Sequence, residues 1–292
     1  MFPDRVGRLV LDGVVDADHY VAPIWLESQR DADKVWSSFF KYCHEAKSAC
    51  QFYRENDKVT DIEERFESFM ERLKENPISV ISKDVLAPFL VTYSDVKYQI
   101  FLMLYAPLYG FRAAAELLDA LERNGEDWFD FIPTHPSYDL GLVLTRSNHS
   151  TTHTLRLRAC SKTWKPNHNS ADPVTPLFAG VKMATKFVDA GFFEQESKEH
   201  CTIAVKSRCT IEKVRAYFRE GKVPDAPRLK GNGSDLLDGE WEKCPADEWP
   251  WHEYQPSARV ASEVEAAELE RLDAWGGIRE AFAQIDLWVR GS

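Results

Sequence analysis

The sequence predicts an α/β fold with a mainly helical segment inserted after its first strand. Residues 8–15 (RLVLDGVV) are short, apolar and β-branched, which is typical of a buried strand. A mostly helical pattern follows from about residue 31 to residue 131. Further on, an acidic residue, a helix, a strand and a histidine follow in that order from Asp172 to His200. A strand, a helical insertion and a second α/β stretch together indicate a core sheet with an inserted cap.

The first half of the insertion predicts two amphipathic helices. Asp31 can cap a helix whose apolar face contains Val35, Trp36, Phe39 and Phe40. Thr60 and Glu63 match a capping box at the start of the next helix. Its apolar stripe consists of Ile62, Phe66, Phe69, Met70 and Leu73. The pair at residues 76–77 (NP) ends this helix.

The second half of the insertion predicts two short strands and two further helices. The strands lie at residues 77–82 and 89–93. Ser94 is the expected cap of an apolar helix that runs to Tyr105, and residues 111–122 form another helix that ends near Gly125.

Residues 146–170 are polar and show no strand pattern. Beyond them, the pattern predicts a helix at 178–187, a strand at 191–195 and a helix at 210–219. Thr210 is the expected cap of the last helix and Gly221 its stop signal. Residues 224–258, rich in Pro, Gly and Trp, are predicted to wrap the surface as a loop, and residues 260–288 as a helical tail.

Composition excludes several classes of function. The net charge of −11 argues against nucleic acid and against an anionic membrane surface, since both need a basic face. No run approaches the roughly 18 apolar residues of a membrane span. No cofactor motif is present, and His149 and His153 lack a metal-site spacing with carboxylates, so neither a cofactor nor a metal is expected.

Six cysteines leave the disulfide pairing open. Cys43 and Cys50 are close enough to close a small loop, Cys201, Cys209 and Cys244 cluster late in the chain, and Cys160 stands apart. Cys201 beside His200 suggests a cysteine nucleophile. However, adjacent residues of a strand point to opposite faces, so a disulfide or a core thiol is the favoured interpretation.

Several segments together resemble one family. Residues 2–16 (FPDRVGRLVLDGVVD) look like the segment after the nucleophile turn of tripeptidyl aminopeptidase-like α/β-hydrolases, and the cysteines at 43 and 50 look like the pair at the start of their cap. Residues 171–176 (ADPVTP), the pair His200-Cys201 and residues 214–219 (VRAYFR) resemble their C-terminal domain. In style, the cap segments at 77–82 and 90–95 are closest to fungal members.

The resemblance implies a serine hydrolase that acts on peptides or small esters, with Asp172 as the triad acid and His200 as the general base. The G-x-S-x-G turn that carries the serine is absent from the sequence. Neither Ser94, explained as a cap, nor Ser161, which has no such turn around it, replaces it. The sequence also lacks an apolar strand before Asp172. We therefore expect an incomplete α/β-hydrolase fold, the C-terminal portion of such an enzyme.

The expected organisation has four parts. Residues 1–30 are a remaining core strand segment, 31–145 a mainly helical cap, 146–222 the C-terminal hydrolase segment, and 223–292 a loop with a helical tail. No signal peptide is recognisable at the N-terminus and the localisation is open, although the resemblance and the cysteines suggest a secreted full-length form.

Two functional hypotheses follow. The chain is a part of a serine hydrolase, or it is a catalytically inactive hydrolase remnant that binds a partner or has no function. The order of Asp172 and His200 favours the first hypothesis. The missing nucleophile favours the second for the chain by itself.

Overall fold

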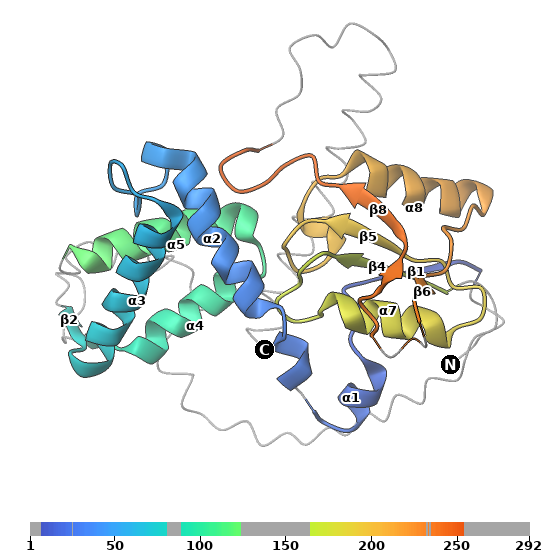
Figure 1. The fold of residues 1–292 in the computed structure, drawn as a ribbon, viewed down its shortest axis with the longest axis horizontal. Coiled ribbons are helices and arrows are strands. Elements are labelled where there is room, and N and C mark those ends of the chain that lie inside the picture. Colours follow the sequence, from blue (N-terminus) through green and yellow to red (C-terminus); the bar gives the residue numbers. More distant parts are fainter. Residues whose placement is uncertain are drawn as a thin grey trace, which may run out of the picture.

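A computed structural model describes residues 7–24, 26–80, 89–123, 164–231, 233 and 235–253. These residues form two lobes, one helical and one built around a sheet (Figure 1). The described chain lies in the sheet lobe from residue 7, crosses to the helical lobe at about residue 32, and has returned to the sheet lobe by residue 164. The helical lobe is thus an insertion between two strands of one sheet.

The main sheet of the described residues has four parallel strands in the order β1-β4-β5-β8. Their bounds are β1 Leu9–Asp12, β4 Trp164–Asn169, β5 Phe193–Glu196 and β8 Glu242–Pro245. β1 and β4 are neighbours although more than 150 residues separate them in the chain, with Leu9 opposite Trp164. Of the strand expected at residues 8–15, only Leu9–Asp12 is a strand, and it is not buried, since Leu9 is 37% exposed.

Helices connect the parallel strands, because such strands cannot be joined by a tight hairpin. The helix α7 (Leu177–Lys186) joins β4 to β5, and α8 (Arg208–Glu220) lies between β5 and β8. Figure 1 shows the sheet between these two helices. Gly221 ends α8 with φ of 75°, a left-handed conformation that favours glycine, as its position in the sequence predicts.

Two strands of this sheet correct the sequence prediction. β4 occupies the polar stretch directly before Asp172, where no strand was expected, and β8 lies inside the predicted surface loop. Apolar periodicity identifies neither, because β4 reads WKPNHN and β8 reads EKCP. Backbone pairing with their neighbours defines these strands instead.

Within the described residues, the helical lobe contains four α-helices and a two-stranded antiparallel sheet, β2-β3. Their bounds are α2 Ala32–Ala46, α3 Val59–Glu75, β2 Ile78–Val80, β3 Phe89–Val91, α4 Tyr93–Met103 and α5 Pro107–Glu122. The stripe expected on α3 is buried throughout. Aromatic rings dominate the core, where Trp36 stacks on Phe39 with ring centroids 4.7 Å apart and Phe111 meets Phe39 edge to face.

Three of the expected helix caps lie elsewhere. The α3 start uses Asp61, whose carboxylate accepts a hydrogen bond from the Lys58 backbone N–H at 2.8 Å, and not Thr60 with Glu63. Thr92, and not Ser94, begins α4. Ser207, and not Thr210, caps α8 by accepting from the Thr210 backbone N–H at 3.2 Å. The N-cap residues are Lys58, Thr92 and Ser207, two or three residues before the expected ones, and each has an extended backbone.

Asp31 does precede α2, but it makes no side-chain cap hydrogen bond. Its backbone is helical (φ −97°, ψ −3°), and its carboxylate instead accepts from Lys34 Nζ at 2.6 Å.

The remaining short elements are α1 Ala17–Val21, η2 Leu26–Gln29, η3 Lys47–Ala49, η4 Thr202–Ala204, β6 Arg228–Leu229 and β7 Gly239–Glu240. The tail expected at 260–288 lies outside the described residues. Among the helices that the structure describes, none has the length and apolar character needed to cross a membrane.

Two disulfides join cysteines of the described chain, Cys43–Cys50 in the helical lobe and Cys209–Cys244 between α8 and β8. Cys201, a disulfide candidate from the sequence, is in neither of them, because Cys209 and Cys244 pair with each other. The second disulfide fixes the outer strand of the sheet to the helix that precedes it.

We predict that the Cys209–Cys244 disulfide contributes more stability than Cys43–Cys50. The two bridges close loops with sequence separations of 35 and 7 residues. Restriction of the unfolded chain then corresponds to about 4 and about 2 kcal/mol respectively. Urea unfolding of the two Cys→Ala double variants measures the difference. Equal losses, or a larger loss from the short loop, would contradict the prediction.

Candidate functional site

The site is centred on Asp172, in the turn that follows β4. Its side chain is completely buried, and Oδ1 accepts hydrogen bonds from the backbone N–H groups of Val174 (3.0 Å) and Thr175 (2.8 Å). Oδ2 accepts another from the Cys201 backbone N–H at 3.0 Å. The turn at 173–176 thus holds the carboxylate in one orientation. Its hydrogen bonds also compensate for the burial of a charged group.

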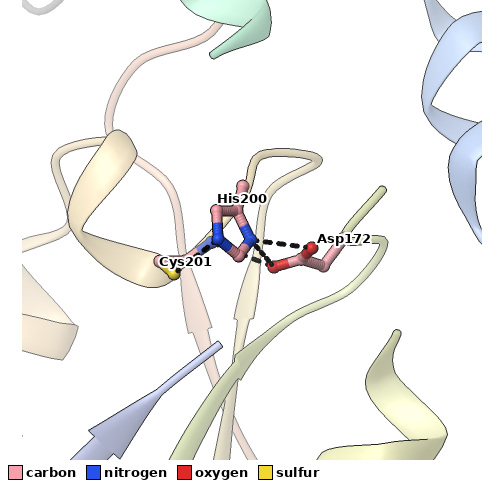
Figure 2. A group of neighbouring side chains, drawn as sticks. All are labelled: Asp172, His200 and Cys201. Atoms are coloured by element: carbon pink, nitrogen blue, oxygen red, sulfur yellow. Dashed lines mark hydrogen bonds and ion pairs between the residues drawn. The ribbon is translucent and has the colours of Figure 1, made fainter. Parts of the chain in front are cut away.

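His200 meets this carboxylate from the loop after β5. Its Nδ1 lies 3.0 Å from Oδ1 and 3.1 Å from Oδ2 of Asp172 (Figure 2). The imidazole side chain is 27% exposed. Its Nδ1 edge faces the buried carboxylate, and part of the ring remains accessible to solvent. A carboxylate at Nδ1 favours the tautomer with the proton on that nitrogen, and it leaves Nε2 as the basic nitrogen.

Buried side chains fix the loop that carries His200. Gln195 is fully buried, and its Nε2 donates to the backbone carbonyls of Thr202 (3.1 Å) and Val205 (3.3 Å). Its Oε1 accepts from the Thr210 hydroxyl at 2.6 Å. This network connects the last core strand before the site to both sides of the turn at 201–205.

The end of β1 holds the same loop from the other side. The Asp12 carboxylate accepts from the backbone N–H groups of Thr202 (2.9 Å) and Ile203 (3.2 Å). Gly13 follows with φ of 64°, and a Cβ there would lie 2.4 Å from Cys201 Sγ and 3.3 Å from His200 Cε1. Glycine is therefore required at this point, both for its backbone conformation and for the close approach.

The helical lobe also contacts the loop of His200. The His200 backbone N–H donates to the Tyr105 carbonyl at 3.1 Å, and the two rings meet edge to face with centroids 5.2 Å apart. The Glu199 carboxylate accepts from the Leu108 backbone N–H at 3.2 Å, in the first turn of α5. A carboxylate is favourable at a helix N-terminus, so this contact joins the two lobes beside the histidine.

Cys201 differs from the sequence expectation. The segment at 200–201 is a loop, since β5 ends at Glu196, and Cys201 has φ of 66° and ψ of 151°. The strand argument that placed its side chain opposite His200 is therefore wrong. Its Sγ lies 3.6 Å from His200 Nε2, on the ring nitrogen opposite to the one that faces Asp172 (Figure 2).

The same three side chains have ligand-type atoms within 4.8 Å of one another, a spacing that would suit a metal ion. The hydrogen bonds argue for a different use. Asp172 is engaged with Nδ1 of His200 and with three backbone N–H groups, so a metal at Nε2 would have only His200 and Cys201 as protein ligands. Zinc sites supply three or four protein ligands. The arrangement therefore favours an imidazole that exchanges protons at Nε2 while the carboxylate fixes its tautomer.

A cavity of about 360 Å³ lies where the two lobes meet, beside the segment that leads to His200. Its charged lining residues are Glu45, Glu196, Lys198, Glu199 and Glu248. Burial lowers the pKa of Lys198, and Lys41 lowers it further. Burial likewise raises the pKa of Tyr42, with Glu199 and Glu45 adding to the effect.

Of the remaining sequence candidates, Ser94 is exposed in the first turn of α4, and Ser161 and Cys160 lie outside the described residues. Asp12, Gly13 and Gln195 were not singled out as site residues from the sequence. A glycine directly after the last residue of a strand was the signal available for Gly13.

One comparison with known proteins matches this part of the chain. The family described as TAP-like protein matches residues 168–230, a range that includes Asp172 and His200. The search of curated proteins found no match. Residues 168–230 are therefore similar to an α/β-hydrolase domain of the TAP-like kind, which relates the chain to hydrolases at this coarse level.

We predict that Gly13→Ala is considerably more destabilising than Gly221→Ala. Both glycines have positive φ, which costs an alanine about 1–2 kcal/mol. Only at Gly13 would the added Cβ overlap a packed sulfur; at Gly221 it would meet the far end of the Arg8 side chain at 3.2 Å. Overlap in a packed site adds about 1–3 kcal/mol. Urea unfolding of the two variants makes the comparison, and an equal loss in both would contradict it.

Proposed function

We propose that this protein hydrolyses acyl bonds, in esters or peptides, with Asp172 and His200 as the acid–base pair of the reaction. The observation that carries the proposal is the Nδ1–carboxylate contact at 3.0 Å between residues 28 positions apart in the chain. The similarity of residues 168–230 to the TAP-like family supports the same chemistry.

In the proposed mechanism, His200 acts through Nε2. This nitrogen takes a proton from the attacking nucleophile and returns it to the leaving group. Asp172 holds the imidazole in one tautomer and stabilises the imidazolium that forms. The buried carboxylate is suited to this role, because three backbone N–H groups keep it in place while the ring changes its charge.

We further propose that residues 31–145 act as a cap over this site. The support is the hydrogen bond from the His200 backbone N–H to Tyr105 and the contact of Glu199 with the start of α5. A cap that contacts the base directly would restrict which substrates reach it, and the cavity between the lobes is a candidate place for the remainder of a substrate.

A second candidate function is binding without catalysis. It is favoured by the sequence, which contains no G-x-S-x-G turn. In that case the pair of Asp172 and His200, here called the dyad, would be a remnant. The purified chain would then fold cooperatively but would not hydrolyse any acyl substrate.

Assays of the purified chain with p-nitrophenyl acetate and with a free-N-terminus tripeptide p-nitroanilide separate the two. We expect His200→Ala to lower kcat/KM by about 10²- to 10⁴-fold, since this is the contribution of a positioned general base. Asp172→Asn should also lower kcat, because it removes the charge that stabilises the imidazolium. His44→Ala, a change in α2, serves as the matched control and should leave the rate unchanged.

The urea midpoint of each variant must accompany the kinetics, because Asp172 is buried and its loss also affects folding. Hydrolysis that persists at the wild-type rate in a folded His200→Ala variant would reject the dyad as the catalytic pair. A wild-type chain with no activity on either substrate would favour the binding function.

A further inference from the structure

Cys201 lies in a position that its sequence context did not suggest. Its partly exposed side chain lies 3.6 Å from Nε2 of His200, the nitrogen that remains basic when Asp172 holds Nδ1. Figure 2 shows carboxylate, imidazole and sulfur in sequence across the site. A thiol, an imidazole and a carboxylate in this order are the components of an activated nucleophile.

The surrounding chain holds the sulfur in this place. The Cys201 backbone N–H donates to Asp172, and the next two backbone N–H groups donate to Asp12. The sulfur also occupies the space left by the missing side chain of Gly13, where a Cβ would lie 2.4 Å from it. Contacts from two separate parts of the chain, the end of β1 and the turn after β4, therefore determine the direction of the Cys201 side chain.

The chemistry of the pair favours thiolate formation. An ordinary cysteine has a pKa near 8.5, so only about 3% of it is ionised at pH 7. A neighbouring imidazole that accepts the proton raises this fraction, because the resulting imidazolium stabilises the thiolate. Here Asp172 stabilises that imidazolium in turn.

We propose that Cys201 is the nucleophile of this site and accepts an acyl group from activated esters. This proposal rests on the acyl-transfer function proposed above. The Sγ proton moves to His200 Nε2, and Sγ forms a bond to the carbonyl carbon. The bond from that carbon to the alcohol oxygen then breaks, and the departing alcohol takes the proton from Nε2. Water then loses a proton to Nε2 and attacks the carbonyl carbon of the thioester. The C–S bond breaks, the carboxylic acid is released, and Sγ takes the proton from Nε2, which regenerates the thiol.

The first test measures the thiol itself. Iodoacetamide labelling of the native protein is followed at Cys201 by peptide mass spectrometry between pH 5 and 10, in a Cys160→Ser background with both disulfides intact. We expect the midpoint of the rate profile to lie at least about one pH unit below that of an ordinary thiol. His200→Ala should return the midpoint to the ordinary value, whereas His44→Ala should not move it. A midpoint that does not respond to His200→Ala would overturn the proposal.

The second test follows the acyl group. Brief incubation with p-nitrophenyl acetate should place one acetyl group on Cys201, and the adduct should be absent from Cys201→Ala and from His200→Ala. Cys201→Gly serves as a second variant, since glycine suits the positive φ at this position and keeps the loop folded. Hydrolysis that depends on His200 but continues in both Cys201 variants would overturn the nucleophile and leave the proposed function intact.

Two further outcomes separate the two proposals. An acetyl group that forms on Cys201 but is not released on the timescale of the assay would support the nucleophile and reject turnover as the function. A disulfide between Cys201 and Cys160, found by peptide mapping of the native protein without reductant, would reject Cys201 as the nucleophile. The proposed function of Asp172 and His200 would then still be tested by the kinetic assay.

Discussion

The buried carboxylate of Asp172 is the constraint on which the rest of the site depends. A carboxylate with no solvent exposure costs several kcal/mol unless hydrogen bonds and a charge partner compensate for it. Three backbone N–H groups and the imidazole of His200 supply that compensation. Because these donors come from the turn after β4 and the loop after β5, satisfying one side chain fixes the relative position of two loops.

The loop of His200 also depends on both lobes of the molecule. On one side, Asp12 at the end of β1 accepts hydrogen bonds from residues 202 and 203. On the other side, the Tyr105 carbonyl of the helical lobe accepts from the His200 backbone N–H, and the Leu108 backbone N–H donates to the Glu199 carboxylate. The imidazole is therefore held in one position by contacts from both lobes. These contacts also couple the orientation of the helical lobe to the pair of Asp172 and His200.

The helices of the fold could be predicted because their signal is local. The stripe on α3 and the stop at Gly221 follow from 3.6-residue periodicity and from the conformational freedom of glycine. β4 and β8 could not be predicted in this way. Their sequences contain charged residues and proline, and they are strands because each pairs with a neighbour that is distant in the chain. The N-cap residues lie two or three residues before the expected ones, because several polar residues near a helix start match the cap pattern and only the backbone conformation decides among them.

By itself, the sequence identified the candidate site residues: an acid in the turn at 171–176 and a histidine after the next strand, in that order. Only the tertiary structure decided that these side chains meet, because the contact requires the parallel pairing of β4 with β5, for example Asn167 with Phe193. It also decided the direction of Cys201. Strand alternation would place this thiol opposite His200, whereas hydrogen bonds from residues 201–203 to Asp172 and Asp12 hold a turn with positive φ that brings it to Nε2.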